Sequence, residues 1–159
     1  MPGLPPLIAE DVQLLDGALD ELLRKSEATA ALIIDKGGPL IGQRGAVDQF
    51  DTTTISALAA GSFCATQAIA GLLGEADFAS IYQQGERYSL LFCNIDENVL
   101  LIVIFKAELS VGAVKYYAAA TLREVGRQLQ AAQQRAPEQS VDLVSMNVLD
   151  VSEIFRKQP

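Results

Sequence analysis

The side chains that carry most acid–base and nucleophilic chemistry in proteins are scarce in this sequence. Histidine is absent from all 159 residues, and cysteine occurs only as Cys64 and Cys93. Without histidine the usual general base, the histidine-dependent triads and the commonest metal ligand are missing. Two cysteines are too few for a cysteine zinc site or a disulfide framework, and they are expected to pack as small apolar residues. We therefore expect no metal and no cofactor.

The other residues that could take part in catalysis have simpler explanations. Ser62 and Thr66 lie in the same predicted helix as Cys64, but no histidine is present to activate a nucleophile. Four carboxylates lie at the ends of predicted elements, where capping and turn formation explain them: Asp35, Asp48, Asp51 and Glu75. Four arginines are candidates for a trans-acting arginine finger, although a solvated surface charge is the commoner explanation for each: Arg44, Arg87, Arg123 and Arg127. The sequence therefore predicts a protein that is not an enzyme.

Charge and glycine patterns argue against nucleotide-binding, nucleic-acid-binding and membrane proteins. The glycines in residues 36–38 and 42–45 match neither a phosphate loop nor a dinucleotide fingerprint, because neither cluster leads from a strand into a helix with the required spacing. The net charge is −8, and the 12 lysines and arginines are scattered, which argues against nucleic acid and acidic membrane surfaces as partners. The longest apolar run, residues 99–105, is far shorter than the roughly 20 residues of a membrane helix. We expect a cytoplasmic protein without membrane insertion.

Apolar periodicity and turn residues predict eight elements in the order α-β-β-α-β-β-β-α. The predicted helices span residues 8–25 and 52–73, and a last helix begins at Ser110 or Gly112 and reaches about Gln134. The predicted strands span 28–35, 40–44, 81–84, 87–95 and 98–105. This order favours an α/β protein of the α+β type, with a five-stranded antiparallel sheet flanked by helices on both faces. Residues 1–134 are expected to form one domain, and residues 135–159 a linker and a C-terminal tail with a short helix at 148–156.

The central predicted helix carries the most informative pattern. Asp51 precedes it as a cap, and Gly74 is a natural residue for its end. No charged residue occurs from Thr52 to Gly74, although a solvated helix face normally carries charge. Gly61 and Gly71 each cost about 1 kcal/mol relative to alanine in a helix, so something other than helix propensity favours them.

Winding this helix at about 100° per residue separates two stripes. The first is the expected core face: Ile55, Leu58, Ala65, Ile69, Leu72 and Leu73. The second contains only small residues and is the expected partner-binding site: Ala57, Ala60, Gly61, Cys64, Ala68 and Gly71. Small side chains let another backbone approach closely, and Phe63, which lies off the core stripe, adds an aromatic of the kind enriched at interfaces. The alternative is a helix buried inside the monomer, but one helix on a five-stranded sheet cannot hide its whole circumference.

Three segments resemble the Roadblock/dynein light chain superfamily, and most of all its bacterial MglB-like branch. They are the central helix with its flanks (residues 50–61 and 64–75), the segment Gln84-Gly-Glu-Arg87 with residues 100–105, and Leu109-Ser-Val-Gly112. The resemblance covers roughly residues 8–134. It implies the Roadblock, profilin-like fold, and a homodimer in which two sheets join and the central helices lie side by side.

The resemblance also implies a function. In MglB-like proteins the helix pair contacts the switch regions of one small Ras-like GTPase (MglA-like) and stimulates GTP hydrolysis without donating an arginine. Positions matching Cys64 and Ala68 face that partner. The tail at residues 148–155 is similar to an acidic, phenylalanine-containing segment that docks onto the GTPase in some relatives, although here it carries only Asp150 and Glu153 as acidic residues.

Two other functions are compatible with the sequence. A scaffold of the same fold would recruit a GTPase or a larger complex without changing hydrolysis. A ligand-sensing domain of the GAF or PAS kind also has a helix-flanked antiparallel sheet, but it needs a pocket with convergent polar groups, and nothing in the sequence points to one.

Overall fold

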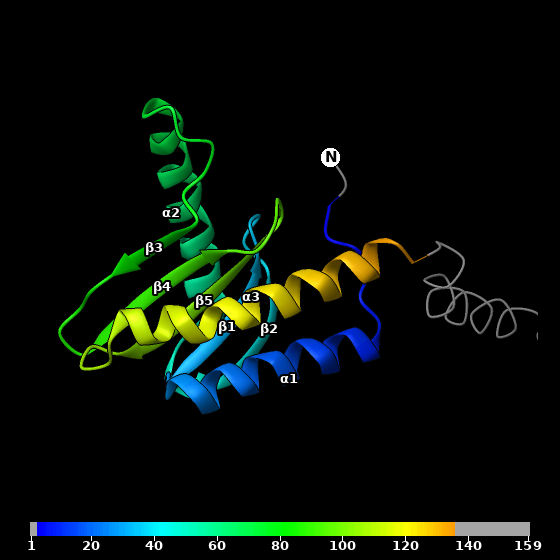
Figure 1. The fold of residues 1–159 in the computed structure, drawn as a ribbon, viewed down its shortest axis with the longest axis horizontal. Coiled ribbons are helices and arrows are strands. Elements are labelled where there is room, and N and C mark those ends of the chain that lie inside the picture. The colour runs from blue at the N-terminus through cyan, green and yellow to red at the C-terminus, as the bar shows by residue number, and fades with distance from the viewer. Residues whose placement is uncertain (1–2, 136–159) are drawn as a thin grey trace, which may run out of the picture.

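The predicted order of helices and strands is confirmed by a computed structural model, which describes residues 3–135 (Figure 1). The elements are α1 (Ala9–Ser26), β1 (Ala30–Asp35), β2 (Leu40–Gly45), the 3-10 turn η1 (Val47–Gln49), α2 (Thr52–Leu72), β3 (Ser80–Gln83), β4 (Tyr88–Asn94), β5 (Val99–Lys106) and α3 (Val111–Gln133). Only η1 is an addition to the predicted order; it lies between the strand predicted at 40–44 and the helix predicted at 52–73. The predicted helix at 148–156 lies outside the described residues, and the domain boundary at residue 134 stays a prediction.

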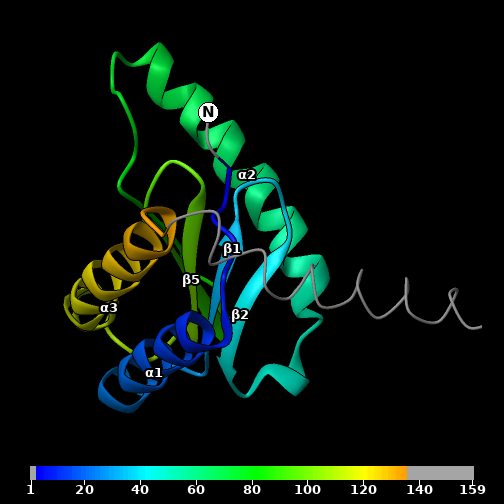
Figure 2. The ribbon, with the colours of Figure 1, turned by 90° about the vertical axis from the view of Figure 1, so that its right-hand side faces the viewer.

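The five strands form one antiparallel sheet in the order β2-β1-β5-β4-β3. α1 and α3 cover one face of the sheet and α2 covers the other (Figure 2). The central strands are therefore buried on both sides. Every residue of β5 from Val99 to Phe105 is buried, as its unbroken apolar run predicts.

Alternating side chains of the central strands belong to two hydrophobic cores, because successive residues of a strand point to opposite faces of the sheet. Ile33 and Val103 pack under α1 and α3, beside Leu19. Their neighbours Leu32 and Ile102 pack on the other face, under α2. The sheet is thus the middle of three layers.

One glycine is required where α1, β1 and β2 meet. Gly45 ends β2 with a φ of +96°, and a Cβ atom at this position would lie 2.5 Å from the Thr29 carbonyl oxygen. Beside it on β2, the Arg44 guanidinium donates to both carboxylate oxygens of Asp20 on α1, at 2.8 and 2.9 Å. α1 is thereby tied to the β2 edge of the sheet.

Among the described residues, α2 is the one helix long and apolar enough to cross a membrane, judged by length and composition only. α2 contains no long uninterrupted apolar run, because serine, threonine and glycine lie between its apolar residues. Helices that pack on a sheet of their own protein can have the same length and composition, and α2 packs on its sheet through Ala59, Ala60 and Phe63. The length and composition of one such helix are weak evidence for a membrane span.

Candidate partner-binding surface

α2 begins at a well-formed cap. The Asp51 carboxylate accepts hydrogen bonds from the Thr54 backbone N–H at 3.1 Å and from the Thr54 hydroxyl at 2.6 Å. These bonds stabilise the charged form, the hydroxyl contributing most, and they lower the pKa of Asp51. The predicted capping role of Asp51 is confirmed.

The side of α2 that packs on the sheet is built from small residues around one aromatic ring. Phe63 is buried, with Ala59 and Ala70 beside it on the same side of the helix. Ser56 is buried as well, and its hydroxyl donates to the Thr52 carbonyl at 2.7 Å. The Lys36 ammonium lies 5.3 Å from the centre of the Phe63 ring, within cation–π range.

The core face predicted for α2 is therefore wrong. Leu58, Ile69 and Leu72 are 69%, 53% and 88% exposed. Ala65 and Leu73 are exposed too, and Ile55 is half-buried. The cause is the near-uniform apolarity of the helix, which leaves no polar face to fix its rotation. The small alanines allow α2 to approach the sheet closely, and Phe63 fills the remaining space.

The interface role expected for Phe63 is also wrong in the single chain, where its ring belongs to the core. The spacing of four and seven residues from Ala59 to Phe63 and from Phe63 to Ala70 is helical, and it marks the inner side of α2. This signal is present in the sequence, but it is weaker than the leucine pattern.

Five of the six residues of the predicted partner-binding stripe lie exposed on the outer side of α2. They are Ala57, Gly61, Cys64, Ala68 and Gly71. The sixth, Ala60, is only 4% exposed and packs in the core beneath α2, so it cannot contact a partner unless the helix moves.

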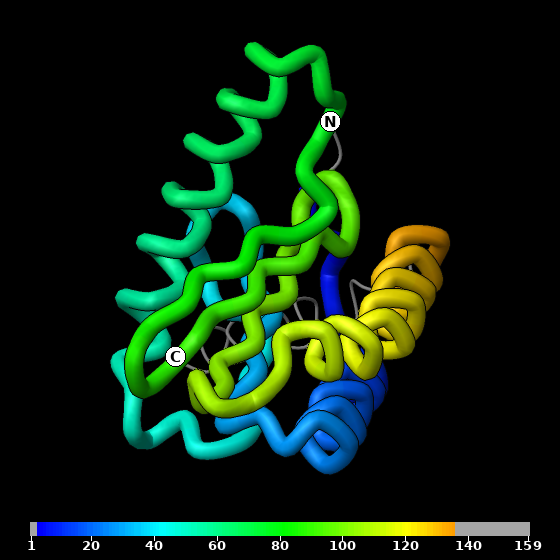
Figure 3. Tube along the Cα trace, turned by 60° about the vertical axis from the view of Figure 1, so that its left-hand side comes forward, coloured from blue at the N-terminus to red at the C-terminus, as the bar shows by residue number. Residues whose placement is uncertain are grey.

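Next to the exposed small residues runs the aliphatic row that the leucine pattern assigns to the core. We define the outer α2 face as the exposed small residues Ala57, Gly61, Cys64, Ala68 and Gly71 together with Leu58, Ile69, Leu72 and Leu73. Towards its C-terminal end α2 stands clear of the sheet before the chain turns back to β3 (Figure 3). The surface is flat where the residues are small, and strongly apolar beside them.

The glycines of this face are not explained by packing within the chain. Among residues 3–135, a Cβ atom added at Gly61 or Gly71 would meet nothing within 4 Å, and neither residue has a positive φ. Alanine at either position would fit and would favour the helix by about 1 kcal/mol.

Three of the remaining candidate residues, Cys93, Arg127 and Arg44, have structural roles. Burial raises the pKa of the Cys93 thiol to about 11, so this group stays protonated at neutral pH. Arg127 is paired with Glu124, and Arg44 with Asp20. Within residues 3–135, no cluster of three or more Cys, Asp or Glu side chains could hold a metal ion.

Comparison with known proteins agrees with this architecture. Residues 14–105 match the model of the Roadblock/LC7 domain family. No curated protein sequence matches significantly. Among solved structures, MglB of Myxococcus xanthus superposes with a TM-score of 0.76 at 26% identity, covering 82% of this chain and 98% of that one.

Two further structures extend the likeness. The gliding protein MglB of Thermus thermophilus gives a TM-score of 0.76 at 30% identity, covering 82% of this chain and 99% of its own. Profilin IB of Acanthamoeba castellanii, at 16% identity and a TM-score of 0.52, shares the fold alone. Since the family model matches more than half of the sequence, and the MglB structures superpose along almost their whole length, this chain belongs to the Roadblock/LC7 domain family.

Proposed function

We propose that this protein is a non-catalytic, cytoplasmic homodimer that binds a small, MglA-like Ras GTPase through the outer α2 face and stimulates GTP hydrolysis. The observation that carries the proposal is that face itself. It exposes Leu58, Ile69 and Leu72 next to a row of small residues, on a helix without a single charge. Contiguous exposed apolar surface of this kind marks a protein–protein interaction site.

The two edges of the sheet favour one way of forming the homodimer. On the β2 side, Arg44 is bound to Asp20 of α1. β3, at the other edge, pairs with β4 alone among the described strands and directly follows the loop that leaves α2. Joining two copies along β3 would extend the sheet and bring the two α2 helices together, which covers apolar surface and unpaired strand edge at once. Self-association has a precedent in a similar structure, described as MglB with a tetrameric arrangement.

The charged residues support regulation without an arginine finger. Arg44 and Arg127 are each held in an ion pair on the sheet face opposite α2. No lysine or arginine lies in α2. Contact through this helix would therefore act on the GTPase by positioning its own catalytic groups.

The direct test measures phosphate release by an MglA-like GTPase from the same organism, with and without the full-length protein. We expect acceleration by the native protein and none by Cys64→Arg or Ala68→Arg. Both substitutions put a large charge on the exposed small residues and leave the core untouched. The matched control is Gln130→Arg on α3, which adds the same charge at an exposed position on the opposite face.

Three outcomes separate the alternatives. Normal stimulation by both arginine variants would contradict the outer α2 face as the binding site. Binding without acceleration at saturating protein would support the scaffold instead. A monomer by light scattering at concentrations that saturate the GTPase would contradict the homodimer.

A further inference from the structure

A second surface lies on the other face of the sheet, between α1 and α3. The two helices leave a groove of about 480 Å³. Its floor contains the buried side chains of Leu22 and Thr121, and it is open because Gly17 and Ala120 are small. Leu14 lines the groove and is 50% exposed, which leaves an apolar wall in contact with solvent.

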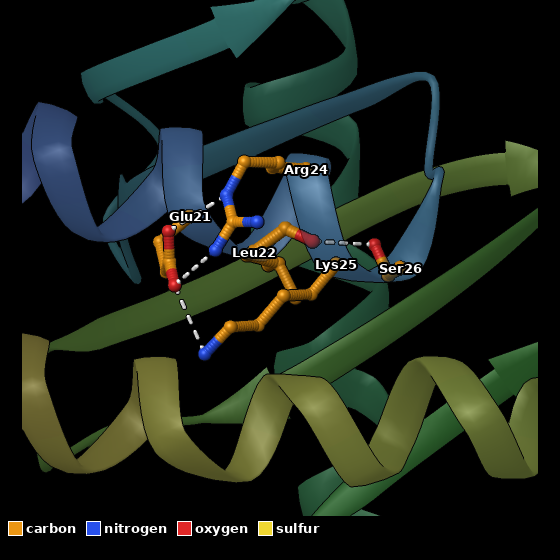
Figure 4. Close-up of polar contacts among 5 residues, drawn as sticks. All are labelled: Glu21, Leu22, Arg24, Lys25 and Ser26. Atoms are coloured by element: carbon orange, nitrogen blue, oxygen red, sulfur yellow. Dashed lines mark hydrogen bonds and ion pairs between the residues drawn. The ribbon is translucent and has the colours of Figure 1, made fainter.

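The rim of this groove is charged, and its balance is positive. The rim carries three basic residues, Lys25, Arg123 and Arg127, and two acidic residues, Glu21 and Glu124. Glu21 of α1 is paired with Arg24 at 2.7 Å and with Lys25 at 2.9 Å, and Figure 4 shows both contacts. Glu124 is paired with Arg127, whereas Arg123 has no ion pair with any residue between 3 and 135. A local excess of positive charge is notable in a chain whose net charge is −8.

The C-terminal segment leaves the fold beside this groove. Arg135, the last described residue, is bound to Asp11 at the start of α1, so the chain exits where the N-terminal end of α1 meets the C-terminal end of α3. The groove begins about two helical turns away, at Gln13 and Arg127, which is roughly 12 Å along α3. Five residues, 136–140, reach up to about 17 Å when extended.

The composition of the following segment matches the groove. Residues 141–155 contain nine large apolar side chains, and all three of their charged residues are acidic. The apolar residues are Val141, Leu143, Val144, Met146, Val148, Leu149, Val151, Ile154 and Phe155, and the acidic ones are Asp142, Asp150 and Glu153. Apolar residues suit the floor and the exposed wall of the groove, and acidic residues suit the basic rim.

We propose that the groove between α1 and α3 is the docking site of this chain's own C-terminal segment, residues 141–155. Docking covers Leu14 and brings acidic side chains to Arg123 and Lys25. A short tether holds the segment near the groove at an effective concentration in the millimolar range, so even weak contacts suffice to keep it bound. The proposal does not depend on a GTPase, and it assigns a role to the groove between α1 and α3, on the side of the sheet opposite α2.

The absence of tryptophan from the sequence provides a direct test. Phe155→Trp in the full-length chain introduces a single fluorophore into the segment. We expect blue-shifted emission and quenching by acrylamide that is several-fold weaker than for a solvated indole. Adding Gly17→Gln and Ala120→Gln, which fill the groove from α1 and α3, should shift the emission to the red and restore quenching. A Cβ at Gly17 meets no atom of residues 3–135 within 4 Å, so the folded domain tolerates the change.

The control is Ala131→Gln, an exposed alanine of α3 outside the groove, which should leave the emission unchanged. Arg123→Glu should weaken docking, because it removes the positive charge that faces the acidic segment. A fully solvated indole in the Phe155→Trp chain without further changes would overturn the proposal. So would an indole that stays protected from acrylamide after the groove has been filled. Protection that disappears on dilution would overturn docking within one chain and show that a second copy supplies the segment. Protection that arises only when a GTPase is added would overturn it too, by placing the segment on that partner.

Discussion

Arg135 and Asp11 join the C-terminal end of α3 to the N-terminal end of α1. The guanidinium donates to both carboxylate oxygens, at 2.8 and 2.9 Å, across 124 positions in the sequence. Gln128 donates to the same carboxylate at 2.9 Å, as does the backbone N–H of Ile8. Asp11 is only 1% exposed, and its charge is therefore held by four hydrogen bonds in a nearly dry site.

Removal of either partner of this pair should destabilise the protein. Asp11→Asn or Arg135→Gln leaves one charge without its counter-ion, which costs roughly 3–5 kcal/mol in a fully buried pair. The Arg135 side chain keeps 17% of its exposure, so we expect a loss of about 2–3 kcal/mol in the free energy of unfolding. Urea unfolding followed by circular dichroism measures it. Glu124→Gln, which breaks the exposed pair with Arg127, is the control, and its effect should stay below about 1 kcal/mol.

The same pair predicts a loss of stability in acid. Its hydrogen bonds, chiefly those from Arg135, lower the pKa of Asp11 from 3.8 to about 2. A depressed carboxyl pKa stabilises the fold above the unfolded value, and this contribution disappears as the pH falls from about 4 towards 2. The native protein should therefore lose about 2 kcal/mol more than Asp11→Asn over this window, measured by urea unfolding at successive pH values. Parallel losses in the two proteins would contradict this assignment.

The fold was predictable from the sequence because its signals are local. The alternating or unbroken apolar runs of the strands, the turn at Lys36-Gly-Gly-Pro39 and the cap at Asp51 each specify an element through its own residues. The charge and glycine pattern of α2 also pointed to an unusual outer surface. The rotation of α2 could not be derived in the same way, because almost every residue of this helix is compatible with burial. Which side faces the sheet is decided by the shape of the sheet around Phe63, which only the folded chain provides. The Asp11–Arg135 pair is likewise invisible in the sequence, since nothing local connects positions so far apart.

Phe63 and Leu72 distinguish the inner side of α2 from its outer side. Phe63→Ala should cost about 3–5 kcal/mol, because it opens a cavity over Leu32 and Ile102. Leu72→Ala should change the stability of the single chain by no more than about 0.5 kcal/mol, because this side chain is 88% exposed. Unfolding at several protein concentrations measures both effects and separates folding from association. In the proposed dimer, Leu72→Ala should weaken association, whereas the large loss for Phe63→Ala should be the same at every concentration.

Gly61 and Gly71 test whether another backbone approaches the outer α2 face. Alanine at either position meets no atom of the described part of the chain within 4 Å and has the higher helix propensity, so each substitution should stabilise the isolated chain by up to about 1 kcal/mol. If a second helix packs against these glycines, the added methyl groups would separate the two helices and weaken the complex. We therefore expect Gly61→Ala and Gly71→Ala to raise the melting temperature under dilute, monomeric conditions and to lower the affinity for the second copy or for the GTPase. Analytical ultracentrifugation and titration with the GTPase measure the two affinities. Ala131→Ser on α3 serves as a control for a small change at an exposed helical site. Greater stability with unchanged affinities would mean that no backbone approaches these glycines, and the preference for them would need another explanation.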